Sequence, residues 1–136
     1  MAEPMTLQII TPDSVVYDGQ STFFVGRAID GSFGILPNHA PMIIALDVAP
    51  PLRIDEPGGT SKEYAVFGGF CEIEHNKVNI VTPDCQDPDV IDIERARRAK
   101  ERAEGRLSHP TPDIDVERAQ AALKRALLRL HVTKQI

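Results

Sequence analysis

The stretch PDVIDIERARRAKERAEGRL, residues 88–107, is where the chain changes from one kind of structure to another. From residue 91 onward it is rich in strong helix formers, with Gly105 as the exception. Asp89 is predicted to cap this helix, and Asp92 then falls in the first turn, where a carboxylate interacts favourably with the helix dipole. The stretch therefore predicts that a long helix begins just after Pro88.

A second helix is predicted after a short break. Pro110 and Pro112 cannot continue a helix, because proline lacks the backbone N–H donor and clashes with the preceding turn. Asp113 or Asp115 is expected to start the second helix, which runs close to the C-terminus. Residues 89–136 are therefore predicted to form a two-helix hairpin.

Alanine and leucine recur at helical spacing along one face of each predicted helix. These residues are Ala96, Ala99 and Ala103 on the first helix, and Ala119, Leu123, Ala126, Leu127 and Leu130 on the second. Alanine facing leucine lets two helices approach closely but buries little apolar area, so the hairpin is expected to be held weakly.

Residues 1–88 have the pattern of short β-strands. Apolar and polar residues alternate in three segments, residues 6–9, 71–75 and 77–80. Turn-forming sequences interrupt the segments at close intervals. Gly58-Gly59 is predicted to form a hairpin turn, and Gly68-Gly69 a bulge or a corner at which the chain bends between sheets. An N-terminal antiparallel β-sandwich is therefore expected over residues 1–88.

The charge of the chain is divided unevenly between these two parts. Residues 1–90 carry four basic residues against thirteen acidic ones, a net charge of −9, whereas residues 91–136 carry eleven against seven, a net charge of +4. Such an asymmetry indicates two segments with different electrostatic partners. No apolar run approaches the roughly 18–20 residues that span a bilayer, so no direct membrane insertion is expected.

The sequence shows no recognisable catalytic or metal-binding pattern. His39 has no serine, cysteine or carboxylate in a triad or ligand spacing, so a structural or interface role is favoured over catalysis. No glycine-rich phosphate loop is present. Cys71 and Cys85 are expected to be buried thiols, with a disulfide as the alternative. The chain is therefore predicted to be neither an enzyme by itself nor a metalloprotein.

Arginines on the two predicted helices suggest an anion site. Asp92, Arg95 and Arg102 fall within about 80° of one another around the first helix, and Arg125 and Arg129 lie one turn apart on the second. A closed hairpin can bring the four guanidinium groups together, and their forked donors match phosphate oxygens.

The polarity of the first helix orients a ligand in this site. The carboxylates of Asp89 and Asp92 repel phosphates from the helix N-terminus, so we expect a nucleotide base at that end and the phosphates further along. The alternative is that the arginines only form surface ion pairs, such as Glu94 with Arg98.

The run GSFGILPNHAPM, residues 31–42, resembles the signature of the ATP synthase epsilon family, with Ser32 and Phe33 as mild departures from the usual acidic residue and leucine. The similarity continues through IDIERA, residues 91–96, and both helices, so it covers essentially the whole chain. The resemblance implies a non-catalytic central-stalk subunit, whose N-terminal β-sandwich binds the gamma subunit and the c-ring. The residues expected at that rotor interface are Gly31, Ser32, Phe33, His39, Ala40, Pro41 and Met42. Residues 31–33 and 37–41 are expected to form loops there, with Phe33 and Met42 exposed.

The resemblance also implies a regulatory hairpin. In such subunits the hairpin either folds down or extends beside the catalytic beta subunits and blocks ATP hydrolysis, with the complex on the cytoplasmic face of the bacterial plasma membrane. The basic charge of residues 91–136 fits an acidic partner independently. ATP is then expected as a regulatory ligand that stabilises the folded hairpin.

The residues that match the ATP-binding members of the family are Ile91, Asp92, Arg95, Ala96, Arg102, Arg125 and Arg129. Gln86 stands where those members carry a glutamate, and an amide can still donate to and accept from adenine. Two other functions remain open: a structural adaptor of the same complex without nucleotide sensing, and a nucleic-acid-binding module using the basic helices. The −9 charge of the sandwich part and its few aromatic residues disfavour the second.

Overall fold

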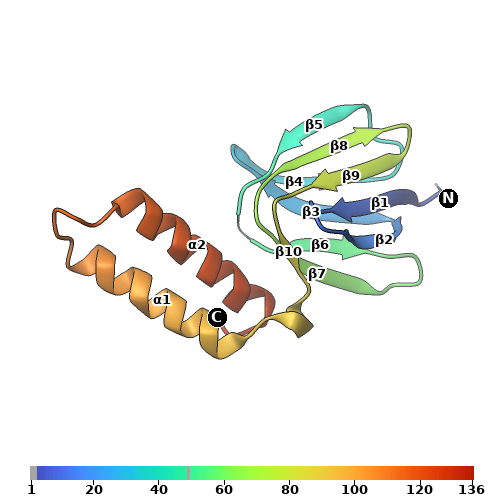
Figure 1. Cartoon of the computed structure of the whole chain (residues 1–136). Coiled ribbons are helices and arrows are strands. Elements are labelled where there is room, and N and C mark those ends of the chain that lie inside the picture. The colour runs from blue at the N-terminus through green and yellow to red at the C-terminus, as the bar shows by residue number, and fades with distance from the viewer. Residues whose placement is uncertain (1–2, 49) are drawn as a thin grey trace.

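In the computed structural model, which describes residues 3–48 and 50–136, a two-sheet sandwich comes first and a pair of long helices last (Figure 1). The strands are β1 Met5–Ile10, β2 Val15–Ser21, β3 Phe23–Ala28, β4 Gly31–Ile35, β5 Met42–Ala45, β6 Leu52–Asp55, β7 Ser61–Val66, β8 Phe70–Glu74, β9 Lys77–Val81 and β10 Cys85–Gln86. A short 3-10 helix, η1 Pro88–Val90, leads into α1 Ile93–Ser108 and α2 Val116–Val132. The predicted order of a β-sandwich followed by a helical hairpin is confirmed.

Each sheet of the sandwich has five strands. One has the order β2-β1-β9-β8-β5 and the other the order β10-β7-β6-β3-β4. Neighbouring strands are antiparallel, as predicted, with one exception among the described residues: β1 and β9 run parallel, from Thr6 opposite Lys77 to Ile10 opposite Val81. In this sheet β1 lies between its antiparallel hairpin partner β2 and the much later strand β9.

The sandwich core follows the alternation seen in the sequence. Leu7, Ile9, Val78 and Ile80 are all buried, while their neighbours along each strand are exposed or half-buried. Cys71 and Cys85 also lie in the core as free thiols, as expected. Burial raises the pKa of each cysteine to about 12, so both thiols stay protonated and unreactive at neutral pH.

Gly68 and Gly69 form the corner at which the chain leaves β7 in one sheet and enters β8 in the other. Their φ angles are +83° and +97°, a region that L-residues rarely adopt. A Cβ on Gly69 would lie 2.0 Å from the carbonyl oxygen of Val81. The corner therefore requires glycine both for its backbone conformation and for the close approach of β9.

Each helical segment begins with an aspartate as its N-cap, but the aspartate that caps the first long helix is not the one that the sequence predicted. Asp92 caps α1, its carboxylate accepting from the backbone N–H of Arg95 at 3.1 Å. The prediction that Asp89 is the cap is wrong, because residues 88–90 form η1, which Asp87 caps. Asp115, one of the two candidates, caps α2.

Among the described residues, no helix is long and apolar enough to span a bilayer.

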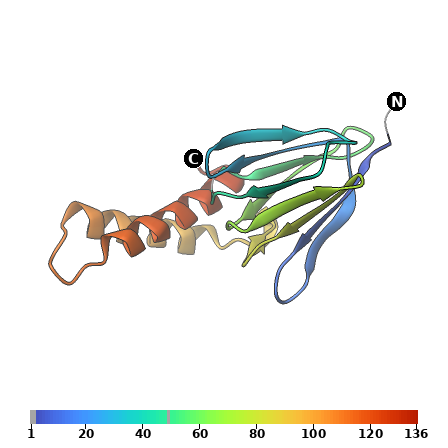
Figure 2. The same ribbon diagram turned by 90° about the horizontal axis from the view of Figure 1, so that it is seen from above.

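The two helices extend away from one end of the sandwich, with the loop between them at the far end (Figure 1 and Figure 2). Five of the eight residues in the predicted stripes are buried: Ala96, Ala103, Ala119, Ala126 and Leu130. The other three, Ala99, Leu123 and Leu127, are half-buried. A second face of α2 was not predicted. Leu128 and Val132 pack on Ala65 and Phe67 at the end of β7, and this small cluster joins the hairpin to the sandwich.

Glycine substitutions test the corner. Replacing Gly69 with alanine is expected to lower the free energy of unfolding by about 3 kcal/mol or more, because positive φ and the Val81 carbonyl both oppose a Cβ. Gly105, in α1, is the control: an added Cβ there meets no atom within 4 Å, so alanine should stabilise by up to about 1 kcal/mol. Urea denaturation measures the free energy of unfolding of both variants. Equal stability of the Gly69 variant and the wild type would contradict the role given to the corner.

Candidate functional site

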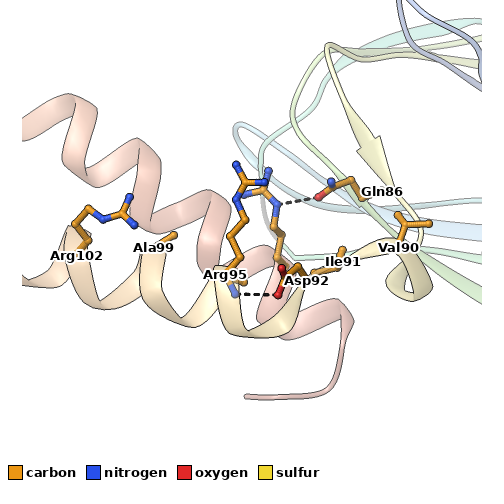
Figure 3. A pocket seen from close by; sticks show the side chains of 9 residues that line it. Gln86, Val90, Ile91, Asp92, Arg95, Ala99 and Arg102 are labelled. Carbon is orange, nitrogen blue, oxygen red and sulfur yellow. Dashed lines mark hydrogen bonds between the residues drawn. The ribbon is translucent and has the colours of Figure 1, made fainter.

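A cavity of about 430 Å³ lies where the sandwich, the first helix and the second helix meet (Figure 3). The cavity is lined by Gln86, Val90, Ile91, Asp92, Arg95, Ala96, Ala99, Arg102 and Arg129. Gln86 comes from β10 and Val90 from η1, while Ile91 and Asp92 join η1 to α1. The four residues from Arg95 to Arg102 belong to α1, and Arg129 belongs to α2. Its size is within the usual range of small-molecule sites.

The structure brings together seven of the eight residues that the sequence singled out for a ligand. Arg125 is the exception, because it does not line the cavity. Two lining residues were not predicted as ligand residues: Val90 and Ala99. The sequence indicated Ala99 as a packing residue, because it belongs to the alanine stripe of the first helix. Val90 was marked only by its position directly before Ile91.

The spacing of α1 explains its contribution. Asp92 ends the extended approach to the helix and caps it, Arg95 follows within the first turn, and Arg102 comes two turns later. In Figure 3 the side chains of Arg95 and Arg102 point to the same side of α1. Ala96 and Ala99 lie between them, and their small side chains leave the space that larger residues would fill.

Arg129 reaches the cavity from α2 and is half-buried. Its Nε donates to Gln86 Oε1 at 2.8 Å, and its guanidinium lies 4.6 Å from the centre of the Phe67 ring. Burial lowers the pKa of Arg129, as do the charges of Arg125 and Arg95, although Asp84 opposes this. A guanidinium remains protonated even so, and Arg129 is therefore a cation in a partly desolvated place.

The cavity attracts anions. Three guanidinium groups and one carboxylate line it, and among residues 3–48 and 50–136 no acidic side chain lies within 4.0 Å of Arg95, Arg102 or Arg129 as an ion pair. The Asp92 carboxylate already caps α1. Val90 and Ile91 give the end near Gln86 an apolar wall. This arrangement suits a ligand with several negative oxygens and a flat apolar group.

Polar contacts hold the hairpin in the position that forms the cavity. Lys124 Nζ of α2 lies 2.6 Å from Asp47 Oδ1, and Lys134 Nζ lies 3.0 Å from Glu63 Oε1. The hydrogen bond from Lys124 lowers the pKa of Asp47. These pairs are partly exposed, so each adds at most about 1 kcal/mol to docking.

Four of the seven residues expected at a rotor interface line a second hollow, of about 440 Å³, between the edge strands β4 and β5. Gly31, Ser32, Phe33 and Met42 line it, whereas His39 and Ala40 lie in the β4–β5 connection, where the His39 ring is bonded to the Ala40 carbonyl. Pro41 borders a neighbouring hollow.

Two expectations about this interface are corrected. Residues 31–33 belong to strand β4 and not to a loop. Phe33 is half-buried rather than exposed, because its ring packs edge-on against Phe24 with 5.9 Å between centroids. The exposed apolar side chains of the hollow are instead Ile29 and Ile43, 73% and 71% exposed, together with Met42.

A line of apolar residues crosses the outer face of the β2-β1-β9-β8-β5 sheet. The register pairs Ala45 with Phe70, Phe70 with Val81, Val81 with Ile10 and Ile10 with Val15, one residue from each strand. Phe70, Val81 and Val15 are each more than half exposed. We call these five residues the apolar row. Exposed apolar side chains side by side on a sheet make this row a candidate interaction surface.

Comparison with known proteins gives matches over nearly the whole chain. Residues 4–87 match the family model "ATP synthase, Delta/Epsilon chain, beta-sandwich domain", and residues 89–134 match "ATP synthase, Delta/Epsilon chain, long alpha-helix domain". An ATP synthase epsilon chain of Desulforamulus reducens is 42% identical over 96% of this chain and 97% of the relative. The corresponding protein of Brevibacillus brevis is 44% identical over 96% of this chain and 98% of the relative.

A solved structure shares the fold. A chain in the mitochondrial ATP synthase of Euglena gracilis, in a structure of OSCP, F1 and c-ring, superposes with a TM-score of 0.81 at 21% identity. The superposition covers 92% of this chain and 78% of that chain.

The contact between Lys124 and Asp47 can be tested by titration. Lys124→Gln is expected to raise the pKa of Asp47 towards its ordinary value, because the donor that lowers it is lost. The pair therefore stabilises docking above the ordinary pKa of an aspartate, and its contribution is lost as pH falls through the lowered pKa. NMR titration of the Asp47 carboxyl measures the shift. Lys100→Gln, which removes an ion pair with Glu104 on α1, is the control and should leave Asp47 unchanged.

Proposed function

The chain belongs to the delta/epsilon family of ATP synthase subunits, and we propose that it is a non-catalytic subunit of the central stalk whose hairpin senses ATP and restrains ATP hydrolysis. The observation that carries the sensing part is the convergence of Arg95, Arg102 and Arg129 on one cavity. Residues from α1, from α2 and from the end of the sandwich all line that cavity, so it exists only while the hairpin is closed and docked.

ATP suits this cavity in charge and in shape. The triphosphate carries several negative oxygens that the three guanidinium groups can bind in forked pairs. The base occupies the end near Gln86, where Val90 and Ile91 are apolar and the Asp92 carboxylate disfavours phosphate. Gln86 Oε1 is bonded to Arg129, which leaves its amide N–H groups for an acceptor on the base.

A ligand of this kind acts as a switch. Because ATP binds only the closed hairpin, it shifts the equilibrium by its full differential affinity. At a concentration of about 100 times the dissociation constant, this amounts to roughly 2.7 kcal/mol. The alanine-lined helix contact and the small docking cluster are weak enough for such an amount to decide the state.

When the hairpin opens, it presents a basic surface. Residues 91–136 carry a net charge of +4, which favours acidic segments of the catalytic beta subunits as its partner in the extended state. An extended hairpin between the rotor and the catalytic subunits obstructs rotation in the direction of hydrolysis. High ATP would therefore close the hairpin and lift this inhibition.

The sandwich carries the attachment to the rotor. The exposed apolar row and the hollow between β4 and β5 are separate apolar surfaces, and we assign them to contacts with the gamma subunit and the c-ring. The complex lies on the cytoplasmic face of the bacterial plasma membrane, and the chain is held there by these partners.

Calorimetric titration with ATP tests the sensor. Arg95→Gln and Arg129→Gln are each expected to weaken ATP binding at least about tenfold, because a hydrogen bond to a charged group contributes roughly 1.5–3 kcal/mol. Arg97→Gln is the matched control, because Arg97 pairs with Glu94 and Gln135 and does not line the cavity. Its affinity for ATP should change by less than about twofold.

ATP should also raise the melting temperature of the wild type by several degrees and that of the Arg95 variant by much less. If the wild type binds no ATP at millimolar concentration, the sensor is excluded and a structural adaptor without nucleotide sensing remains. Binding of duplex DNA in the same format, with affinity that exceeds that for ATP, would instead favour a nucleic-acid module.

Removing the hairpin tests its inhibitory role. A fragment of residues 1–88 should fold with a β-type circular dichroism spectrum, because the sandwich core contains no residue of α1 or α2. A complex reconstituted with this fragment is expected to remain coupled and to hydrolyse ATP faster than one with the full chain. Equal hydrolysis rates for the two complexes at low ATP would rule out inhibition by the hairpin.

A further inference from the structure

The side chains that contact the Arg129 guanidinium directly are neutral. Its Nε donates to the Gln86 amide oxygen at 2.8 Å, and its guanidinium carbon lies 4.6 Å from the centre of the Phe67 ring. In the part of the chain that the structure describes, no carboxylate pairs with it within 4.0 Å and no side chain bonds to its Nη groups. Arg129 is therefore fixed in position without losing its charge or its outer donors.

Phe67 is itself fixed by the sandwich. The residue is 8% exposed and directly follows β7, and its backbone N–H donates to the Asp84 carbonyl at 3.1 Å. The Gly68-Gly69 corner comes next and holds the chain in one conformation. Phe67 also packs in one cluster with Leu128 and Val132 of α2. The ring thus contacts the α2 face that docks and also the neighbouring arginine.

An aromatic face is a suitable support for an arginine that must bind phosphate. A guanidinium over an aromatic ring is attracted by the face of the ring, and one that stacks through its own flat face keeps its edge and forked N–H donors free for oxygens. Stacking also removes rotamer freedom before the ligand arrives, so less ordering is needed on binding. A carboxylate in the same place would position the side chain but would compete with the ligand for it.

We propose that Phe67 is a positioning residue for the ligand site, which holds the Arg129 guanidinium against the sandwich so that it meets the phosphates of ATP when the hairpin docks. This inference rests on the proposed function, since it concerns the same cavity. It makes the sandwich a part of the sensor: α1 and α2 supply the charges, and the end of β7 supplies the surface that orients one of them.

The test separates positioning from simple docking. Phe67→Leu keeps an apolar side chain in the cluster but removes the ring, and it is expected to weaken ATP binding about three- to tenfold by calorimetry. Phe67→Tyr restores an aromatic face and should bind within about twofold of the wild type. Val132→Ala is the matched control, because it weakens the same cluster without removing the surface under Arg129.

A double-mutant cycle gives the decisive readout. In an Arg129→Gln background, Phe67→Leu should change ATP affinity by less than about twofold, whereas Val132→Ala should have the same effect in both backgrounds. The proposal is overturned if Phe67→Leu binds ATP as the wild type does, or if its loss is undiminished in the Arg129→Gln background. These outcomes differ from failure of the proposed function, in which the wild type itself binds neither ATP nor inorganic triphosphate at millimolar concentration.

Discussion

The contact between the second face of α2 and the end of β7 is the interaction on which the rest of the functional structure depends. It is small: Leu128 and Val132 meet Ala65 and Phe67, supported by two partly exposed ion pairs. The sandwich core is complete without it. The cavity, in contrast, is complete only with this contact, because its walls come from both the sandwich and the hairpin. A weak junction between two well-formed parts is what a reversible switch requires, since a ligand can only shift an equilibrium whose states are close in free energy.

Charge is arranged around this junction in a consistent way. The carboxylate nearest the cavity, that of Asp92, is occupied as a helix cap, and the partners of Arg129 are an amide and an aromatic ring. The carboxylates that do pair with the hairpin, those of Asp47 and Glu63, bind lysines outside the cavity. The cations that pair with the sandwich are therefore not the cations that line the cavity, so docking of the hairpin does not neutralise the cavity.

The sandwich combines a rigid interior with two apolar surfaces on its outside. The glycine corner at residues 68–69 both closes the two sheets and sets the position of Phe67, so the same backbone constraint contributes to the core and to the site. The apolar row lies on the outer face of one sheet, and the hollow with Ile29 and Ile43 lies between the edge strands of both sheets. Neither surface includes a residue of the cluster that joins the hairpin to the sandwich, so the proposed attachment to the rotor does not depend on how the hairpin is placed.

Local patterns in the sequence determined the elements of this protein. Strand alternation, proline breaks, capping residues and the spacing of arginines depend on neighbours within one or two turns. The sandwich, the hairpin and seven of the nine residues that line the cavity could therefore be predicted from the sequence. The resemblance over residues 31–42 and 91–96 added the family, which the comparisons bear out.

Tertiary structure alone decided the rest, because it depends on residues far apart in the chain. The parallel pairing of β1 with β9 and the apolar row follow from strand order, which no local pattern encodes. The same holds for the docking face of α2, since Leu127 and Leu128 are both apolar and only the partner surfaces show which of them faces the sandwich. Phe67 is the clearest case. In the sequence it is one apolar residue before two glycines, and only the fold places its ring under a guanidinium sixty-two positions away.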